Sequence, residues 1–254
     1  MQAYGPGFAK IYNLRFGDFA RAVAPRIRAY YESTNVGQAG TKSIVDICCG
    51  TAVLDVHFLG NGYTAVGVDL SHSMLEYARL NTNAYVEARQ ARFFETDATQ
   101  FGVERPVGLA VSTYESINHL PDMAALTSCF QHAYQAVVSG GSFIFDLNTR
   151  VGLRRWAAMN IQEGDDLTMI TSGVHDEAQN RAYNRIFGFL RLDNGKYERF
   201  EEVVCNTAFG LTSVRNSLHE SGWQSVRFCR ITDLNTALDE PEKESRVWVV
   251  AMKS

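Results

Sequence analysis

The sequence has little of what would indicate a disulfide-stabilised, membrane-spanning or nucleic-acid-binding protein. Its five cysteines are an odd number with no CxxC pair, so neither a disulfide framework nor a zinc site is indicated. No apolar run reaches the roughly 18 residues of a membrane span, and residues 1–16 lack the apolar segment of a secretory signal. No block of Lys or Arg stands out in a chain of formal net charge -4, which disfavours a nucleic-acid partner. These absences favour a cytoplasmic protein with free thiols and no metal site.

The length and composition are those of an ordinary globular protein. The chain has 254 residues, of which 46% are hydrophobic and 20% charged. A chain of this length forms one large domain, or one domain that carries an insertion. It also buries enough apolar surface to fold without disulfides.

Short apolar runs alternate with helical segments through the first 150 residues. Residues 8–31 have apolar side chains at helical spacing, and Gly17 and Pro25 are expected to break or bend that helix. After a polar connector, strands are expected at 43–49, 63–70, 91–98, 107–114 and 142–149, and helices at 52–62, 71–84 and 123–141. Strands that alternate with helices in this way form a parallel sheet, so we predict a doubly wound α/β fold.

The pattern changes after about residue 165. Three extended segments follow, and the Asn194–Gly195 pair between the last two is typical of a tight hairpin. We interpret this part as a small antiparallel sheet that covers the parallel core as a lid. The extended segments are 166–178, 181–192 and 198–210, and the chain ends with a helix at 213–223 and strands at 225–232 and 245–253.

The segment Val45 to Ala52, VDICCGTA, carries the first chemical signal. It reads as a strand that ends in a turn of small residues before a helix begins. Such a turn lets a ligand approach the backbone, and the helix N-terminus presents free N–H groups. Asp69 ends the next strand, nineteen residues after Gly50, where a carboxylate can accept hydrogen bonds from ribose hydroxyls. Asp97, near the end of the third strand, can accept from an exocyclic amine at the same edge of the sheet.

Four motifs in this order and spacing resemble the class I S-adenosylmethionine-dependent methyltransferases. They are VDICCGTA (45–52), GVDLSHSML (67–75), FETDATQF (94–101) and VSTYESINHL (111–120). The chain is most similar to the small-molecule branch, which includes sugar and amine N-methyltransferases with a β-rich lid. The resemblance covers about residues 8–150 and 211–253.

This resemblance implies a fold, a cofactor and a domain division. The fold is a doubly wound, mostly parallel seven-stranded sheet of the Rossmann-like type with a small antiparallel β lid, and the cofactor is S-adenosylmethionine. The implied division is an N-terminal helical cap (1–42), a cofactor-binding core (43–160 and 205–254) and a lid insertion (161–204).

The resemblance also implies a role for individual residues. The assigned residues are Asp46, Cys48, Gly50 and Thr113 for the methionine part of the cofactor, Asp69 for the ribose, Leu70, Met74, Asp97 and Ala98 for the adenine, and Tyr12 as a cover over the cofactor.

The sequence departs from the family pattern at two positions. Cys48 stands where the family has its first glycine, and Ala52 where it has its last. Both residues are small, so the turn is expected to form, although the Cβ of Cys48 can narrow the cofactor pocket. A helix N-terminus lowers thiol pKa, but burial of Cys48 and Cys49 in the turn favours inert packing.

Three residues after the fourth strand are candidates for the catalytic site. His119 can take a proton from a substrate amine or hydroxyl, or it is a loop histidine that only hydrogen-bonds the backbone. Glu115 can orient a cationic amine or be solvated. Tyr114 can line the methyl-transfer channel or pack in the core.

Other polar residues have both a functional and a structural interpretation. Asp146 and Asn148 end the fifth strand, where they can touch a substrate or satisfy loop backbone. The remaining candidates are Arg154, Arg155 and Trp156, which lead into the lid, and His175, Tyr183 and Arg185 on the lid strands, where alternation turns some side chains inward.

The sequence therefore predicts transfer of a methyl group from S-adenosylmethionine to a nitrogen or oxygen of a small-molecule acceptor. The sulfonium is already activated, so proximity and alignment supply most of the catalysis and no catalytic triad is expected. One alternative is a non-catalytic S-adenosylmethionine-binding regulatory protein, which the unusual Cys48 and Ala52 would suit. The other is an NAD-dependent dehydrogenase, whose GxGxxG pattern is missing after Gly50. The sequence leaves open the acceptor itself and whether the chain forms a homodimer.

Overall fold

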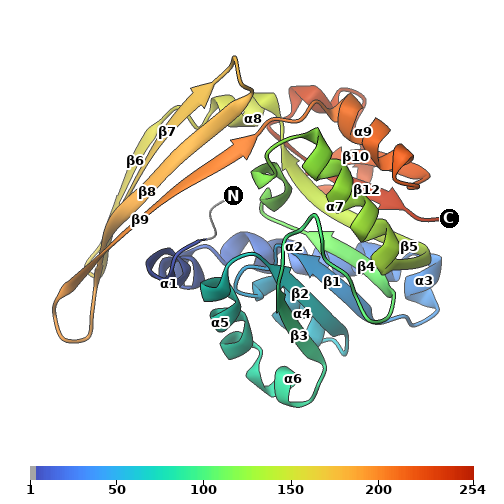
Figure 1. Cartoon of the computed structure of the whole chain (residues 1–254), viewed down its shortest axis with the longest axis horizontal. Coiled ribbons are helices and arrows are strands. Elements are labelled where there is room, and N and C mark those ends of the chain that lie inside the picture. The colour runs from blue at the N-terminus through green and yellow to red at the C-terminus, as the bar shows by residue number, and fades with distance from the viewer. Residues whose placement is uncertain (1–3) are drawn as a thin grey trace.

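The computed structural model describes residues 4–254, so the first three residues of the predicted N-terminal cap (1–42) lie outside the described part. It contains an eight-stranded core sheet with helices on its faces and a separate four-stranded sheet beside it (Figure 1). The predicted doubly wound α/β fold with an antiparallel lid is therefore confirmed. No helix within residues 4–254 is both long and apolar enough to cross a membrane.

The core sheet has the strand order β11-β10-β12-β5-β4-β1-β2-β3. The strands β1 to β5 are parallel, whereas β12 lies antiparallel between β5 and β10. The strand order reverses between β1 and β4, and open α/β sheets bind ligands outside the carboxyl ends of the strands at such a point. The strands are β1 (Ser43–Ile47), β2 (Thr64–Asp69), β3 (Ala91–Glu95), β4 (Val107–Ser112), β5 (Val137–Asn148), β10 (Ser225–Arg230), β11 (Asp233–Ala237) and β12 (Arg246–Met252).

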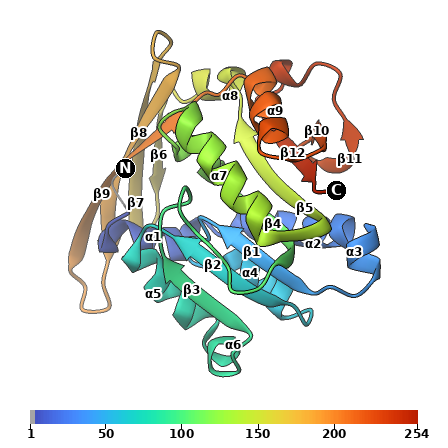
Figure 2. The same ribbon diagram turned by 45° about the vertical axis from the view of Figure 1, so that its right-hand side comes forward.

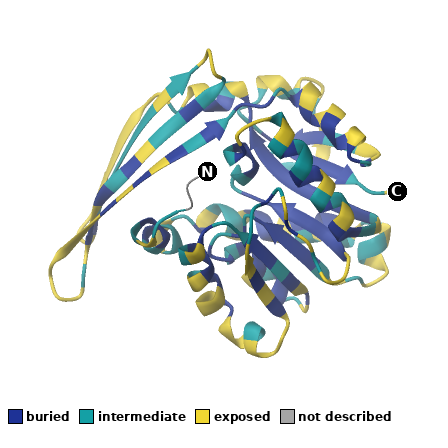
Figure 3. Ribbon diagram, in the orientation of Figure 1, coloured by how far each residue is buried: buried dark blue, intermediate teal, exposed yellow. Residues whose placement is uncertain are grey.

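Helices cover both faces of the core sheet (Figure 2). One face carries α2 (Asp18–Glu32), α4 (Val53–Leu59) and α5 (His72–Asn81), and the other carries α7 (Met123–Ala136) and α9 (Leu211–Glu220). As expected for strands covered on both sides, the central strands are buried along their length (Figure 3). The shorter helices are α3 (Asn35–Gln38), α6 (Asn83–Glu87), α8 (Arg150–Arg154) and the 3-10 turns η1 (Ser116–His119) and η2 (Pro241–Lys243).

The lid sheet has the order β6-β7-β8-β9, and every pair in it is antiparallel. Its inner face packs on helix α1 (Pro6–Arg15), where Phe8 and Ile11 meet apolar side chains of the lid strands and Met74 of α5. Its strands are β6 (Met159–Glu163), β7 (Leu167–Asp176), β8 (Arg181–Arg191) and β9 (Tyr197–Thr207).

Two helix predictions need correction. The helix predicted at 123–141 ends at Ala136, and residues 137–141 begin β5, where β-branched Val137 pairs with Val107 of β4. Pro25 does not break α2, although Gly17 does separate α1 from α2 as predicted. Pro25 and Arg21 are both exposed. The Arg21 carbonyl that loses its N–H partner at Pro25 therefore lies on the solvent side of the helix.

Two strands were not predicted. β6 has five exposed residues in the sequence MNIQE, which lacks a clear alternation, and β11 is a short edge strand. The core sheet therefore has eight strands where seven were expected. The lid strands run from 159 to 207, slightly beyond the predicted insertion 161–204.

Candidate active site

The turn after β1 keeps a glycine-like backbone without the usual glycines. Cys48, Gly50 and Ala52 have positive φ angles of 61°, 54° and 59°. A side chain in this left-handed region costs roughly 1–2 kcal/mol per residue. The turn is closed by a hydrogen bond from the Cys49 N–H to the Val68 carbonyl, at 3.0 Å. At both departures from the family pattern, Cys48 and Ala52, the backbone therefore adopts the left-handed conformation that glycine favours.

Asp69 fixes this turn from the neighbouring strand. Its two carboxylate oxygens accept the N–H groups of Gly50 and Ser71, each at 2.8 Å. Burial raises the pKa of Asp69, and the backbone hydrogen bonds oppose that shift. Each carboxylate oxygen still has a second lone pair, so the group can also accept from a ligand. Leu70 and Met74 follow Asp69 on the wall of the large cavity described below.

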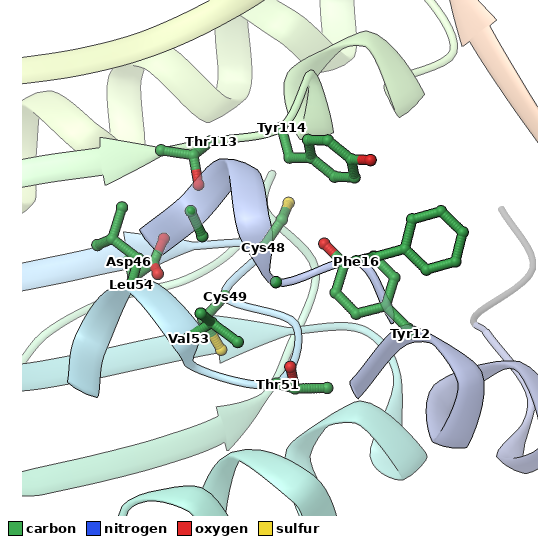
Figure 4. Close-up of a pocket in the computed structure, with 12 residues that line it drawn as sticks. Tyr12, Phe16, Asp46, Cys48, Cys49, Thr51, Val53, Leu54, Thr113 and Tyr114 are labelled. Carbon is green, nitrogen blue, oxygen red and sulfur yellow. The ribbon is translucent and has the colours of Figure 1, made fainter. Parts of the chain in front are cut away.

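A small pocket lies behind the turn (Figure 4). Figure 4 shows Asp46 and Thr113 on one side and the rings of Tyr12, Phe16 and Tyr114 on the other. Asp46 is the last residue but one of β1, is 2% exposed, and its Oδ1 has no hydrogen-bond partner within residues 4–254. A buried carboxylate oxygen without a partner is costly. The pocket therefore suits a cationic group with N–H donors.

A larger cavity of about 420 Å³ adjoins this pocket and shares with it the residues Tyr12, Phe16, Cys48 and Tyr114. Its floor includes Cys48, Gly50 and Asp69, and the Tyr12 ring lies over Gly50, 3.5 Å from the place a Cβ there would occupy. The opposite wall comes from the lid and the segment before it, with the side chains of Trp156, Asn184, Ile186 and Val204. The cavity therefore joins the carboxyl edge of the core sheet to the inner face of the lid.

His119 is held in one orientation at this cavity. Its Nδ1 lies 3.0 Å from the Cys205 carbonyl and its Nε2 lies 3.2 Å from the Tyr4 hydroxyl. A carbonyl can only accept, so Nδ1 carries the proton and Nε2 accepts from Tyr4. Burial lowers the pKa of His119 to about 4. The imidazole is therefore neutral at pH 7, and its one lone pair, on Nε2, accepts from Tyr4, which also lines the cavity.

Tyr114 and Glu115 also line the cavity, and both have positive φ, at 66° and 50°. Asp146 holds this strained pair by accepting their two N–H groups at 2.8 Å and 2.9 Å. Arg246 of β12 bridges Asp146 at 2.6 Å and Glu115 at 2.8 Å. Burial raises the pKa of Glu115, and Arg246 opposes the shift. Glu115 is therefore a paired carboxylate, and Asp146 satisfies loop backbone, one of its two expected roles.

Three residues assigned to the cofactor have other partners or positions. Asp97 and Ala98 line neither cavity, and Asp97 accepts from the N–H and hydroxyl of Thr99 at 2.8 Å and 2.7 Å. The Thr113 carbonyl accepts from the Ser116 hydroxyl at 2.8 Å. The cofactor roles of these three residues stay predictions.

The remaining candidates divide between the cavity and the surface. Trp156 lines the cavity, whereas the exposed Arg154 and Arg185 pair with Glu177 and Glu201. Arg155 is exposed, His175 and Tyr183 are half-buried, and the Asn148 N–H donates to the Asn118 side chain. Burial raises the pKa of the Cys48 and Cys49 thiols well above its usual range, which keeps them protonated and favours inert packing.

Three residues at the site were missed from the sequence. Tyr4 and Arg246 come from the chain ends, and no local pattern links them to the motifs. Asp55 of α4 is fully buried in hydrogen-bonding contact with Asp46. A signal for Asp55 existed, because it shares the apolar stripe of its helix with Phe58 and Leu59, three and four residues later.

The sequence is similar to those of known methyltransferases. Residues 44–141 match the family model described as a methyltransferase domain. A curated protein of Geobacillus sp. (strain WCH70) with a provisional methyltransferase name is 26% identical over 221 residues, which are 85% of this chain and 87% of that protein.

Solved structures share the fold along almost the whole chain. An S-adenosylmethionine-dependent methyltransferase from Clostridium acetobutylicum has a TM-score of 0.77 at 19% identity, with 98% of each chain covered. A sugar N-methyltransferase from Streptoalloteichus sp. has a TM-score of 0.76 at 19% identity, with 100% of this chain and 95% of that chain covered. An amino pentose methyltransferase from Micromonospora echinaspora, solved with S-adenosylmethionine bound, has a TM-score of 0.69 at 15% identity, with 100% and 99% covered.

Proposed function

We infer that this chain, a class I methyltransferase by its domain match and its fold, transfers the methyl group of S-adenosylmethionine to a nitrogen of a small amine. One observation carries the proposal: the predicted cofactor edge and the His119 imidazole line the same cavity of about 420 Å³. A cofactor bound at Gly50 and Asp69 and an acceptor beside His119 would therefore lie next to each other.

The residues of the cofactor edge fit S-adenosylmethionine. Asp69 offers a fixed carboxylate for the ribose hydroxyls, and Asp46 offers a buried oxygen without a partner for the ammonium group. The aromatic rings of Tyr12, Phe16 and Tyr114 lie beside the pocket of Asp46, where they favour positive charge. When bound, the cofactor supplies an activated methyl group.

The state of His119 favours a nitrogen acceptor over an oxygen acceptor. A hydroxyl must lose its proton to attack, and a base works best when its pKa is close to the operating pH. His119 has a pKa of about 4, and Glu115 is paired with Arg246, so both are weak bases at pH 7. A neutral amine already has a lone pair. The Nε2 of His119, which accepts from the Tyr4 hydroxyl in the structure, can accept the amine N–H in its place and so orient the amine.

The cavity also suits a small organic acceptor. Its lid side presents Trp156, Ile186 and Val204 as apolar surface and the Asn184 side chain as a polar group. The chain's net charge of -4 gives no electrostatic attraction for nucleic acid. We keep the division into a cap (1–42), a core (43–160 and 205–254) and a lid (161–204) as part of the proposal.

Calorimetry with S-adenosylmethionine, S-adenosylhomocysteine and NADH tests the cofactor. We expect micromolar binding of the two sulfur compounds and none of NADH. Binding of NADH alone would overturn the proposal in favour of a dehydrogenase.

Mass spectrometry of a panel of small amines and their hydroxyl counterparts tests the acceptor. We expect a gain of one methyl group on the amines only. Methylation of hydroxyl compounds alone would contradict the nitrogen assignment. Cofactor binding without methylation of any panel member would favour a non-catalytic regulatory protein.

The outer face of the lid favours a homodimer as a further part of the proposal. Strand alternation and register place several exposed apolar residues on that face, away from α1. An apolar patch of this kind marks an interaction surface, and homo-oligomers bury such patches against each other. The residues are Met159, Ile161, Val174 and Phe189, which are 45–67% exposed.

Light scattering coupled to gel filtration tests the dimer. We expect a dimer for the native chain and a monomer for Ile161→Glu. Leu80→Glu is the matched control, because Leu80 is 70% exposed on α5 of the core and should leave the dimer intact. A native monomer would remove this part of the proposal.

A further inference from the structure

Two carboxyl groups meet behind the cofactor turn. Asp46 is the last residue but one of β1 and Asp55 lies in the first turn of α4, and they are 2% and 0% exposed. Their side chains are in hydrogen-bonding contact. Asp46 Oδ1 and both oxygens of Asp55 accept from no N–H or hydroxyl donor within residues 4–254. Two carboxylates can bond to each other only if one of them carries a proton, so the pair holds one.

The electrostatic surroundings favour this proton. Burial raises the pKa of both groups, that of Asp55 to about 7. Asp69 of β2 adds a like charge that also raises the pKa of Asp46. The other titratable groups around the pair are the protonated thiols of Cys48 and Cys49 in the turn, and the hydroxyls of Tyr12 on α1 and Tyr114 after β4. None of these four is a cation that would stabilise two negative charges.

Only Asp46 of the pair faces the small pocket, whereas Asp55 lies behind it on α4. Building on the function proposed above, we propose that Asp55 is a positioning residue that takes the shared proton from Asp46 when an ammonium group enters this pocket. In that step the O–H bond at Asp46 breaks and an O–H bond at Asp55 forms, with no change in the number of protons in the pair. Asp46 then presents a full carboxylate, and the Asp55 hydroxyl donates back to it.

The proposal predicts a proton released at low pH. Near pH 6 a fraction of the free protein holds two protons on the pair, and a bound cation requires that one of them leave. Near pH 8 the second proton is already gone. The affinity of S-adenosylhomocysteine, which carries the same ammonium group, should therefore be about tenfold weaker at pH 6 than at pH 8, because one pKa unit corresponds to a factor of ten.

Calorimetry in buffers of different ionisation enthalpy measures this release. For the native protein we expect close to one proton released on S-adenosylhomocysteine binding at pH 6 and little at pH 8. Asp55→Asn removes the neighbouring negative charge and keeps a donor to Asp46, and both changes lower the pKa of Asp46, so the release at pH 6 and the pH dependence of affinity should both be lost. Glu76→Gln, an exposed carboxyl on α5, is the control and should behave as the native protein.

Infrared spectroscopy of the ligand-free protein tests the proton itself. We expect the band of a protonated carboxylic acid at pH 7, absent in Asp55→Asn and present in Glu76→Gln. Ligand binding without proton release at pH 6, or release that survives in Asp55→Asn, would overturn the proposal, as would the absence of the infrared band. If the band is present but S-adenosylhomocysteine does not bind, the pair stands and the proposed function fails.

Discussion

The two sides of the large cavity are built in different ways. The cofactor side consists of short segments that end adjacent parallel strands, and backbone hydrogen bonds to Asp69 and Asp146 fix its shape. The lid side consists of single side chains from distant parts of the chain, such as Tyr4, His119 and Asn184. The first side is set by local sequence, and the second by how the lid and the N-terminal segment pack. Changes on the two sides should therefore affect different measurable quantities.

The largest effect is expected on the lid side, at His119. His119→Ala removes the Nε2 acceptor that orients the amine, and misplacement of a reactant by about 1 Å can lower the rate by about 100-fold. We expect that loss in kcat/KM for the amine, with a dissociation constant for S-adenosylhomocysteine that changes less than about twofold. Steady-state kinetics and calorimetry measure the two quantities. If the affinity for S-adenosylhomocysteine fell as much as kcat/KM, the two sides of the cavity would not act independently.

Tyr4→Phe is the matched control, because it removes only the hydroxyl that His119 accepts. Its kcat/KM should stay within about threefold of the native value. Because the pKa of His119 is lowered to about 4, the neutral imidazole is present throughout pH 6–8, and the share of kcat/KM that depends on it falls only as the pH approaches 4. A loss centred near pH 6.5 would contradict the buried, neutral state.

On the cofactor side, Asp69→Asn should have the opposite signature. A hydrogen bond to a charged group contributes about 1.5–3 kcal/mol, so the affinity for S-adenosylhomocysteine should fall by roughly 30-fold while the methylation rate at saturating cofactor changes little. Glu95→Gln is the control, because Glu95 is the register partner of Asp69 on β3 but is exposed and paired with His72. If Glu95→Gln lowered the affinity for S-adenosylhomocysteine as much as Asp69→Asn, the effect would come from the loss of a negative charge and not from the hydrogen bonds of Asp69.

The cofactor side should also lower the stability of the fold at high pH. The folded state raises the pKa of Asp55, so folding takes up a proton, and the stability that this provides is lost as pH rises from the unfolded value near 4 through about 7. Asp55→Asn removes this dependence. At pH 8 the free energy of unfolding of Asp55→Asn should be roughly 1–3 kcal/mol higher than that of the native protein, because the native protein must keep a costly buried carboxylate. Urea unfolding of the native protein and of Asp55→Asn at pH 5 and pH 8 measures these free energies. The same change in stability between the two pH values in both proteins would contradict the prediction.

The cofactor side of the cavity could be predicted from the sequence, whereas most of the lid side could not. The four motifs correctly placed β1 to β4 and the turn after β1, because a buried parallel strand and its turn are encoded by consecutive residues. The class of enzyme predicted from them agrees with the domain match over 44–141. The lid hairpin at Asn194–Gly195 was also predicted, because its turn chemistry is local.

What escaped prediction depends on contacts between distant residues. The Tyr4–His119 hydrogen bond joins residues 115 positions apart, and the Arg246–Glu115 pair joins the last strand to the loop after β4. Strand β6 is an exposed edge whose pairing with β7, and not its own composition, makes it a strand. Helix α7 ends at Ala136 because the next residues pair with β4, which its own sequence does not reveal.

The smallest effect is expected at the turn itself, and it tests whether local sequence alone sets the cofactor side. Ala52→Gly relieves a positive φ that costs roughly 1–2 kcal/mol for a residue with a Cβ. It also removes a buried methyl, worth about 0.8 kcal/mol, and adds freedom to the unfolded chain. We therefore expect the free energy of unfolding to stay within about 1 kcal/mol of the native value. Ala22→Gly, in the exposed interior of α2, should lose about 1 kcal/mol because no strain is relieved there. If Ala52→Gly were the more destabilising of the two in urea unfolding, the turn would depend on the packing of that methyl group and not on backbone conformation.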